Sequence, residues 1–382
     1  MRLLHTSDWH LGRSFHREDL LVAQALFVDF LVETVRSEAV DAVLVSGDIY
    51  DRALPSVDAV ALCNDALLRL ASTGVRVVLI SGNHDSATRL GFGAELIDTA
   101  GIHLRTDPAR CGQPVLLPDD QGAVAVYAVP YLEPDAVRAE LGCEERSHAA
   151  VLGAAMARVR ADLAGRPGVR SVALAHAFVT GAEPSESERD ISVGGVPSVP
   201  LSAFDGVDYA ALGHLHGAQR LSPHVRYSGS PLPFSFSEEH QAKQLLLVDM
   251  TGPPGAPVSV ESVSTPVHRP LARLRGGLDD LLTGGRWAPY EGHYLQVTLT
   301  DPARPREPME RLRARFPHVL VLGFAPDGSP GGTTSYAARV RGRNDLEVAT
   351  DFVDHVRGPA EPDEAALLEA GFEGVRLAEA SR

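Results

Sequence analysis

The chain is 382 residues long, with 44% hydrophobic and 22% charged residues. This length exceeds one compact core of ordinary size, and the composition is that of a globular protein, so we expect two domains and a tail. No apolar run approaches the roughly 18 residues that a membrane helix requires, and the apolar start is too short for a signal peptide. Three cysteines without a C-x-x-C pair argue against a disulfide framework and favour the reducing cytoplasm.

The formal net charge of −15 weighs against unaided binding to nucleic acid, because such binding relies on lysine and arginine to neutralise phosphates. A local basic patch or a partner protein would supply the missing attraction. Bound divalent cations would also reverse the field at a site. The charge therefore counts against autonomous binding to DNA and does not exclude chemistry on it.

The first half of the chain alternates short apolar runs with helical patterns, which is typical of β-α-β units. A helix is expected over residues 19–37, because Phe27, Leu31 and Val35 recur at helical spacing. Strands are expected over five apolar runs, at residues 2–6, 42–46, 75–81, 171–175 and 209–212.

A second helix is expected over residues 56–72, with Ser56 as its N-cap. The face that carries Val57, Val60 and Leu68 is almost wholly apolar, so this face is predicted to be buried.

Closely spaced strands at residues 225–228 and 244–250 indicate a second sheet packed on the first, and the Pro/Gly-rich residues 251–257 approach a boundary. Beyond it, strands near 271–275, 294–300 and 318–324 with a helix at 308–316 predict a smaller unit. The predicted fold is therefore α/β, with two packed mixed β-sheets flanked by helices. Its expected parts are a main domain over residues 1–265, a small α/β domain over 266–345 and a helical tail over 346–382.

Five polar clusters each follow a predicted strand: Asp8-Trp9-His10, Gly47-Asp48-Ile49-Tyr50-Asp51, Gly82-Asn83-His84-Asp85, His176, and Gly213-His214-Leu215-His216. Ligands bind at the carboxyl ends of strands in open α/β sheets, so these clusters are expected to meet. Singly, each has an ordinary explanation: D-x-H and H-x-H arise by chance, Gly-Asp is usually a turn, and His176 suits a core. The prediction depends on the whole ordered set.

Imidazole, carboxylate and amide groups without a thiolate favour Mn, Fe or Zn over an all-oxygen Mg site. Two such ions roughly 3.5–4 Å apart act as one clamp, which a bridging carboxylate would hold. Asp8 and His10, two residues apart at a strand end, are expected to share a metal, as are His214 and His216. Glycines at 47, 82 and 213 would allow the backbone to turn sharply and approach closely.

The ordered set D-x-H, G-D-x-x-D, G-N-H-D, H and G-H-x-H resembles that of the calcineurin-like metallophosphoesterases. Longer strings resemble the SbcD family of nuclease subunits: Met-Arg-Leu-Leu-His-Thr-Ser-Asp-Trp-His-Leu-Gly at residues 1–12, Glu-Arg-Asp-Ile-Ser-Val-Gly-Gly from Glu188, Tyr-Ala-Ala-Leu-Gly-His-Leu-His from Tyr209, and Arg-Tyr-Ser-Gly-Ser-Pro-Leu-Pro-Phe-Ser-Phe from Arg226. The resemblance is dense over about residues 1–250. It implies a metal-dependent DNA nuclease of repair and recombination, an exonuclease on duplex ends and an endonuclease on single-stranded or hairpin DNA.

The resemblance also implies a role for each motif residue. Asp48 would bridge two divalent ions, Mn²⁺ or alternatively Mg²⁺. One site would be completed by Asp8, His10 and His216, and the other by Asn83, His176 and His214. His84 would stay off the metals and act on the scissile phosphate, while the Asp51 carboxylate orients the His84 imidazole.

The implied partners are DNA and an SbcC-like coiled-coil ATPase subunit, to which a C-terminal helical segment would attach. The assembly would be a homodimer within a heterotetramer, without membrane contact. The small domain would select DNA structure, which makes its arginines at 304, 306, 311, 313 and 315 either phosphate contacts or ordinary surface. The polar residues 185–198 would be a flexible loop or a loop that contacts substrate or a second subunit.

Two alternatives stay open. The first is another enzyme of the same superfamily, such as a nucleotidase, a cyclic-nucleotide phosphodiesterase or a protein phosphatase. The lack of a signal peptide counts against a secreted nucleotidase, and the second domain and tail count against a small phosphodiesterase. The second alternative is a non-catalytic protein scaffold, which the complete motif set disfavours.

Overall fold

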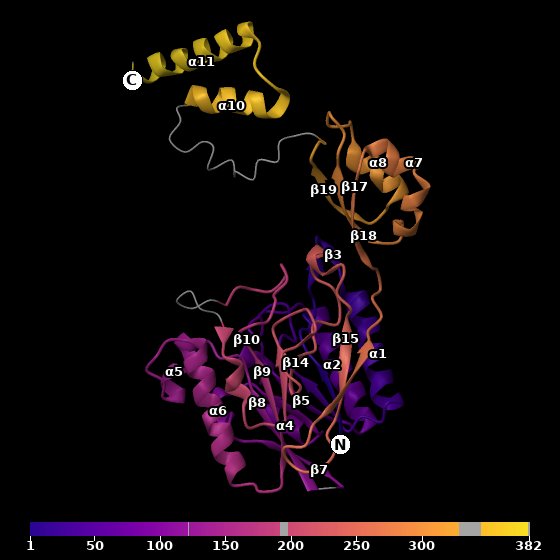
Figure 1. The fold of residues 1–382 in the computed structure, drawn as a ribbon, viewed down its shortest axis with the longest axis vertical. Coiled ribbons are helices and arrows are strands. Elements are labelled where there is room, and N and C mark those ends of the chain that lie inside the picture. The colour runs from indigo at the N-terminus through magenta and orange to yellow at the C-terminus, as the bar shows by residue number, and fades with distance from the viewer. Residues whose placement is uncertain (121, 192–197, 328–344, 381–382) are drawn as a thin grey trace. The chain divides into compact units, whose positions relative to one another are not determined.

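The computed structural model describes residues 1–120, 122–191, 198–327 and 345–380. The chain divides into two compact units, Met1–Ala325 and Pro326–Arg382. Part of the predicted polar loop (192–197) and part of the predicted small domain (328–344) lie outside the described residues. Two six-stranded sheets form most of the first unit (Figure 1).

The first sheet has the strand order β16-β15-β1-β4-β5-β6. Its parallel part is β1, β4, β5 and β6, and β15 and β16 extend it antiparallel. The bounds of its strands are β1 Arg2–Thr6, β4 Ala42–Val45, β5 Arg76–Ile80, β6 Ile102–Arg105, β15 Gln244–Asp249 and β16 Ser259–Ser264. Strand β4 is a continuous apolar run buried along its whole length, as expected of a parallel strand covered on both faces.

The second sheet has the order β13-β14-β12-β9-β8-β7, with β14, β12, β9 and β8 mutually parallel. The bounds of its strands are β7 Val115–Asp119, β8 Gly122–Val129, β9 Arg170–His176, β12 Tyr209–Gly213, β13 Gln219–Arg220 and β14 Val225–Tyr227. The sequence analysis predicted β9, β12 and β14 and assigned no element to residues 82–170, which contain β6, β7 and β8.

Three apolar clusters hold the layers together. One lies between the sheets and joins residues such as Leu44 and Ile80 to Val126 and Leu174. A second packs α1 (Leu21–Ser37) and α2 (Val57–Thr73) on the outer face of the first sheet, and a third packs α6 (His148–Ala164) and α5 (Pro134–Leu141) on the second sheet. The two packed mixed sheets flanked by helices confirm the predicted fold class.

The predicted buried face of α2 was wrong. Ser56 caps the helix as expected, since its Oγ accepts the Ala59 N–H at 3.2 Å. The buried residues are Ala59, Cys63, Ala66 and Leu70, whereas Val57 is 84% exposed. Both faces of this helix carry apolar residues, and the smaller side chains allow a close approach to α1 and the sheet.

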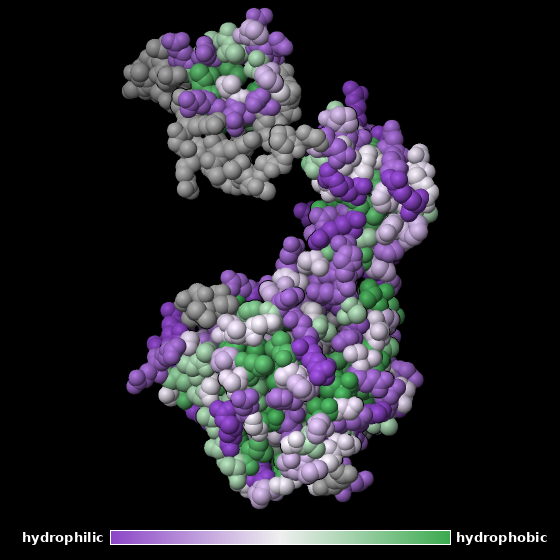
Figure 2. Space-filling view, viewed as in Figure 1, coloured by the Kyte–Doolittle hydropathy of each residue, from purple (hydrophilic) through white to green (hydrophobic). Residues whose placement is uncertain are grey.

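The short elements of this unit lie in connections. They are β2 Ser14–Phe15, β3 Glu18–Asp19, β10 Phe178–Val179, β11 Ser198–Val199, α3 Ala87–Leu90 and α4 Ala94–Asp98. Hydrophilic and hydrophobic residues are interspersed on the face drawn in Figure 2. Among the described helices, none combines the length and the apolar character needed to cross a membrane.

A three-stranded parallel sheet with its own apolar core follows in the same unit: β17 Leu271–Gly276, β18 Tyr294–Leu299 and β19 Val319–Phe324, with helices α7 Leu278–Thr283 and α8 Pro308–Arg315. These elements match the sequence expectation to within one or two residues at their ends. Two of its arginines are paired, Arg311 with Asp279 at 3.0 Å and Arg315 with Glu291 at 2.9 Å. The second unit contains α10 (Asp345–Arg357) and α11 (Pro362–Ala380), which lie against each other.

His5 connects the two sheets through its imidazole. Nε2 donates to the Leu212 carbonyl at 3.1 Å, and Nδ1 accepts from the Tyr209 hydroxyl at 3.0 Å. Both ring nitrogens are satisfied only in the neutral form, and burial lowers the pKa of His5 to about 3. The unfolded chain therefore takes up a proton below pH 6.5 that the folded chain rejects, so stability is lost as the pH falls from 6.5 towards 3.

We expect His5→Gln to reduce this pH dependence, because an amide offers one donor and one acceptor without titrating. Between pH 7.5 and 5.5 the wild type should lose about 1.4 kcal/mol more unfolding free energy than the variant. Urea unfolding of both proteins at the two pH values measures the difference, in which the contributions of the other histidines cancel. Equal losses in the two proteins would contradict the assignment.

Candidate metal centre

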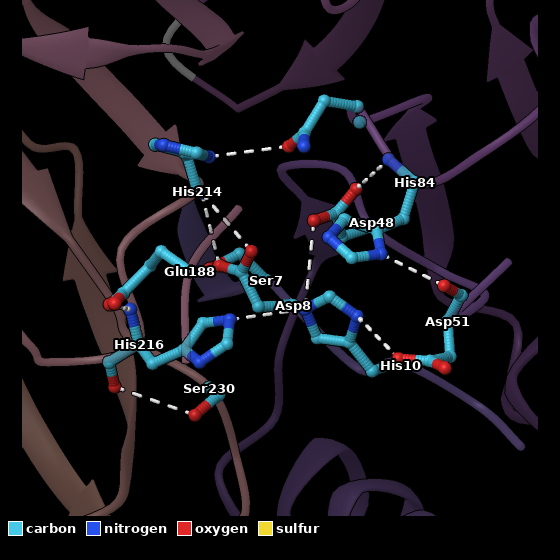
Figure 3. Close-up of polar contacts among 12 residues, drawn as sticks. Ser7, Asp8, His10, Asp48, Asp51, His84, Glu188, His214, His216 and Ser230 are labelled. Carbon is cyan, nitrogen blue, oxygen red and sulfur yellow. Dashed lines mark hydrogen bonds and ion pairs between the residues drawn. The ribbon is translucent and has the colours of Figure 1, made fainter. Parts of the chain in front are cut away.

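The predicted site residues follow the carboxyl ends of five parallel strands from both sheets. Asp8 and His10 follow β1, Asp48 follows β4, and Asn83 and His84 follow β5. In the second sheet, His176 ends β9, and His214 and His216 follow β12. Figure 3 shows the labelled side chains of this set converging on one region. The structure therefore brings together residues that are up to 208 positions apart in the sequence.

Glycine at 47, 82 and 213 is required by close contacts, as the sequence predicted. A Cβ on Gly82 would lie 2.1 Å from Asp48 Oδ1, and one on Gly213 would lie 1.9 Å from the Ser46 carbonyl oxygen. Gly47 has a φ of +93°, and a Cβ there would lie 2.5 Å from His176 Nδ1. These contacts bring the two sheet edges close enough for their side chains to meet.

Four candidate ligands have left-handed backbone: Asp8 (φ 54°), His10 (φ 45°), Asp48 (φ 51°) and His214 (φ 104°). The expectation that Asp8 and His10 sit at a strand end was wrong in this detail, because β1 stops at Thr6. Non-glycine residues seldom adopt positive φ, and such strain concentrates at functional sites. The surrounding strands fix this costly geometry, which aims the side chains inward.

One group of candidate ligands joins Asp8, His10 and His216, each offering a nitrogen or carboxylate oxygen within 4.8 Å of the others. The Nε2 atoms of His10 and His216 are only 3.1 Å apart. The Asp8 carboxylate is held by the backbone N–H of His214, at 3.1 and 3.2 Å. This is the set predicted to complete one metal site.

The other group gathers around Asn83. Its Oδ1 lies 2.9 Å from His176 Nε2 and 3.2 Å from His214 Nδ1. His176 Nδ1 donates to the Ser46 carbonyl at 2.9 Å, which leaves the Nε2 lone pair directed into the site. Asp48 lies between the groups, since its Oδ2 is 3.5 Å from Nε2 of both His10 and His176.

His84 is oriented by backbone and not by the Asp51 carboxylate, so that part of the prediction was wrong. His84 Nδ1 donates to the Asp51 carbonyl oxygen at 2.8 Å, and the carboxylate lies 3.7 Å from His10 Nδ1 and 3.6 Å from Arg13 Nη1. The His84 N–H also holds Asp48 Oδ1 at 2.9 Å. His84 lies within 4.8 Å of ligand atoms of His10 and Asp48, so distance alone does not keep it off a metal.

Burial disfavours charge on nearly every group of the cluster. It raises the pKa of Asp8 to about 6 and that of Asp48 well above the usual range. It lowers the pKa of His176 to about 3, and those of His10 and His214 well below the ordinary value. The imidazoles are therefore held neutral, which is the form that binds metal.

The donor set fits divalent cations. His10 Nδ1 and Asn83 Nδ2 are buried without a hydrogen-bond partner within the described part of the chain, and two imidazole nitrogens face each other. Buried polar groups left in this way are costly, and cations would satisfy the facing lone pairs and stabilise ionised Asp8 and Asp48. Imidazole, carboxylate and amide donors together suit Mn, Fe or Zn.

Several supporting residues were missed by sequence reasoning. Asp85 accepts hydrogen bonds from the N–H groups of Ile49, Tyr50 and Gly82 at 2.9 to 3.0 Å, which ties two site loops together. Its place in Gly-Asn-His-Asp was a usable signal. Glu238 and Lys243, an ion pair at 2.6 Å beside His216, gave no local signal, because Ser-Glu-Glu-His reads as surface.

Two family models match the chain: calcineurin-like phosphoesterase over residues 1–119, and type 5 capsule protein repressor C-terminal domain over residues 267–357. Two curated relatives, each named as the SbcD subunit of nuclease SbcCD, come from Escherichia coli strains K12 and O157:H7. Each is 36% identical over 290 residues, which cover 73% of this chain and 72% of the relative. Among solved structures, TT1561 of Thermus thermophilus matches at a TM-score of 0.40 and 14% identity, over 68% of this chain and 98% of that one.

The sheets, the site and the first family model define the class, a calcineurin-like phosphoesterase. The identity to the two Escherichia coli relatives extends over most of both chains. The chain belongs to the SbcD family of nuclease subunits. Its function is that of a metal-dependent nuclease, as the resemblance in the sequence implied.

We expect Gly82→Ala to lower the unfolding free energy by about 1–3 kcal/mol, because the added methyl group overpacks against Asp48. Mn²⁺ binding should weaken in parallel, since Asp48 must move. Calorimetric titration and urea unfolding measure both effects. Gly153→Ala is the matched control, because nothing lies within 4 Å of its added Cβ in α6, and it should stabilise the chain by up to about 1 kcal/mol. Unaltered binding in Gly82→Ala would contradict the tight contact.

Proposed function

We propose that this chain is a Mn²⁺-dependent DNA nuclease that degrades duplex ends and cuts single-stranded or hairpin DNA, as the nuclease subunit of a complex with an SbcC-like coiled-coil ATPase. The observation that carries the proposal is the meeting of two groups of candidate ligands at Asp48. A bridging carboxylate between two donor sets is what a two-metal phosphodiesterase requires. A protein scaffold has no use for buried carboxylates and imidazoles in strained backbone.

We assign Asp8, His10 and His216 to one ion, Asn83, His176 and His214 to the other, and Asp48 to both. When bound, the two ions lower the pKa of a water molecule and neutralise charge on the phosphoryl group. The chain's part is to hold these side chains at fixed tautomers and positions. His176 is held by the Ser46 carbonyl, and Asp48 by the His84 N–H.

His84 is assigned to the scissile phosphate. Its Nδ1–H is committed to the Asp51 carbonyl, so Nε2 is the ring atom left to contact a phosphoryl oxygen or to protonate the leaving oxygen. Arg13 lies beside the Asp51 carboxylate, with its guanidinium 4.8 Å from the centre of the Phe234 ring. A cation at this place adds to the attraction for phosphate.

A partner subunit accounts for the acidic balance. With a net charge of −15, the chain alone has little general attraction for DNA, so an ATPase partner would supply most of the grip. In this proposal, residues 1–265 are the nuclease domain, 266–345 select DNA structure and 346–382 attach to the partner, in a heterotetramer built on a homodimer. The three free cysteines support a reducing, cytoplasmic setting.

The test of the proposal is hydrolysis in the presence of Mn²⁺ of linear duplex and hairpin DNA, compared with a small phosphodiester and a phosphomonoester. We expect cleavage of DNA by the wild type and background rates for Asp48→Asn, because an amide removes the bridging charge. Asp58→Asn, an exposed carboxylate in the first turn of α2, is the control and should retain full activity. Hydrolysis of monoesters alone would replace the nuclease assignment by a phosphatase.

His84→Ala should retain two bound Mn²⁺ ions while the turnover of DNA falls about 10²–10⁴-fold, the usual loss for a general acid or base. Metal content by elemental analysis and single-turnover cleavage separate these effects. His240→Ala, whose side chain is 92% exposed, provides the control. Loss of one ion in His84→Ala would instead make His84 a ligand.

A further inference from the structure

The segment of residues 185–188 is fixed against the candidate metal centre. Glu188 Oε1 accepts the His216 N–H at 2.8 Å, and Glu188 Oε2 accepts the Ser185 N–H at 2.8 Å. Arg13 donates to the Ser187 carbonyl at 3.1 Å, and the Glu186 N–H donates to Ser237 Oγ at 3.1 Å. These contacts replace the expected flexible loop with an ordered segment, at least over this described part.

The Ser187 hydroxyl lies between two buried side chains. Its Oγ is 2.5 Å from His216 Nδ1 and 2.5 Å from Glu238 Oε1. An ionised carboxylate only accepts hydrogen bonds, so the single hydroxyl proton goes to Glu238. The Ser187 oxygen then accepts from His216 Nδ1–H. This chain of bonds leaves the lone pair of His216 on Nε2, the atom that faces His10.

The far end of this chain is a buried ion pair. The Glu238 and Lys243 side chains are 0% and 1% exposed and lie 2.6 Å apart. Lys243 also donates to the His216 carbonyl at 2.8 Å, so the backbone and the imidazole of His216 are held from the same pair. Glu238 Oε2 accepts the Phe234 N–H at 3.2 Å as well, which leaves little freedom for the carboxylate to move.

Glu238 does not reach His216 by itself. The distance from His216 Nδ1 to Glu238 Oε1 is 3.6 Å, beyond a hydrogen bond. We propose that Ser187 is a positioning residue, whose hydroxyl transmits the hold of the Glu238–Lys243 pair to His216 and thereby sets the metal affinity of the group Asp8, His10 and His216. The inference rests on the proposed metal centre, and it gives the 185–188 segment a function in that centre.

The test is calorimetric titration of metal-free protein with Mn²⁺. Ser187→Ala should weaken the affinity of one ion about tenfold, the lower end of the usual cost of removing a group that orients a metal ligand. The melting temperature of the metal-free variant should stay close to that of the wild type. Ser187→Thr keeps the hydroxyl and should restore the affinity, which a general packing defect would not allow.

Ser237→Ala is the matched control. It removes a hydrogen bond of the same segment without touching His216 and should bind Mn²⁺ like the wild type. If Ser187→Ala fails to fold, Ser187→Cys decides, because a thiol has a similar shape and is a weak hydrogen-bonding group. This variant should also bind one ion more weakly.

The outcomes separate the two proposals. Two ions bound by the wild type with equal affinity in Ser187→Ala or Ser187→Cys would overturn the role of Ser187 and leave the metal centre standing. A wild type that binds no Mn²⁺ would overturn both. Equal weakening in Ser187→Ala and Ser237→Ala would also overturn the inference, because the effect would then belong to the whole segment and not to the hydroxyl.

Discussion

The rest of the structure depends on the buried carboxylate of Asp48. One oxygen accepts the His84 N–H at 2.9 Å, and the other lies 3.5 Å from His10 and from His176. Loops from β1, β4, β5 and β9 thus meet on one charged group whose ionised form the interior disfavours. The absence of side chains at Gly47, Gly82 and Gly213 follows from this requirement, because any Cβ there would collide with the atoms that meet.

Strain at this point is offset by the layers around it. Asp8, His10 and Asp48 adopt positive φ, each at a cost of order 1–3 kcal/mol. The strands that carry them are fully buried apolar runs, paired on both sides and packed between a helical layer and the second sheet. A rigid scaffold therefore imposes a local geometry that an isolated loop would not keep, which is a general property of precise binding sites.

Sequence reasoning located the strands that carry the site because buried parallel strands are continuous apolar runs followed by polar loops. It failed where this contrast is missing. In α2 both faces are apolar, and only the packing against α1 and the sheet selects Ala59 and Ala66 over Val57. It also failed for Ser187, Glu238 and Lys243, since their burial results from contacts between segments 27 to 51 residues apart, which no local pattern encodes.

The same distinction explains why the candidate ligands were predictable and the atoms that orient them were not. A ligand must be histidine, aspartate or asparagine, so its type leaves a mark in the sequence. An orienting group needs only an acceptor at the right place. The Asp51 carbonyl for His84 and the Ser46 carbonyl for His176 are backbone atoms that any residue would supply. His216 differs, because a serine hydroxyl orients it, and this makes its orientation open to mutation in a way that the other two are not.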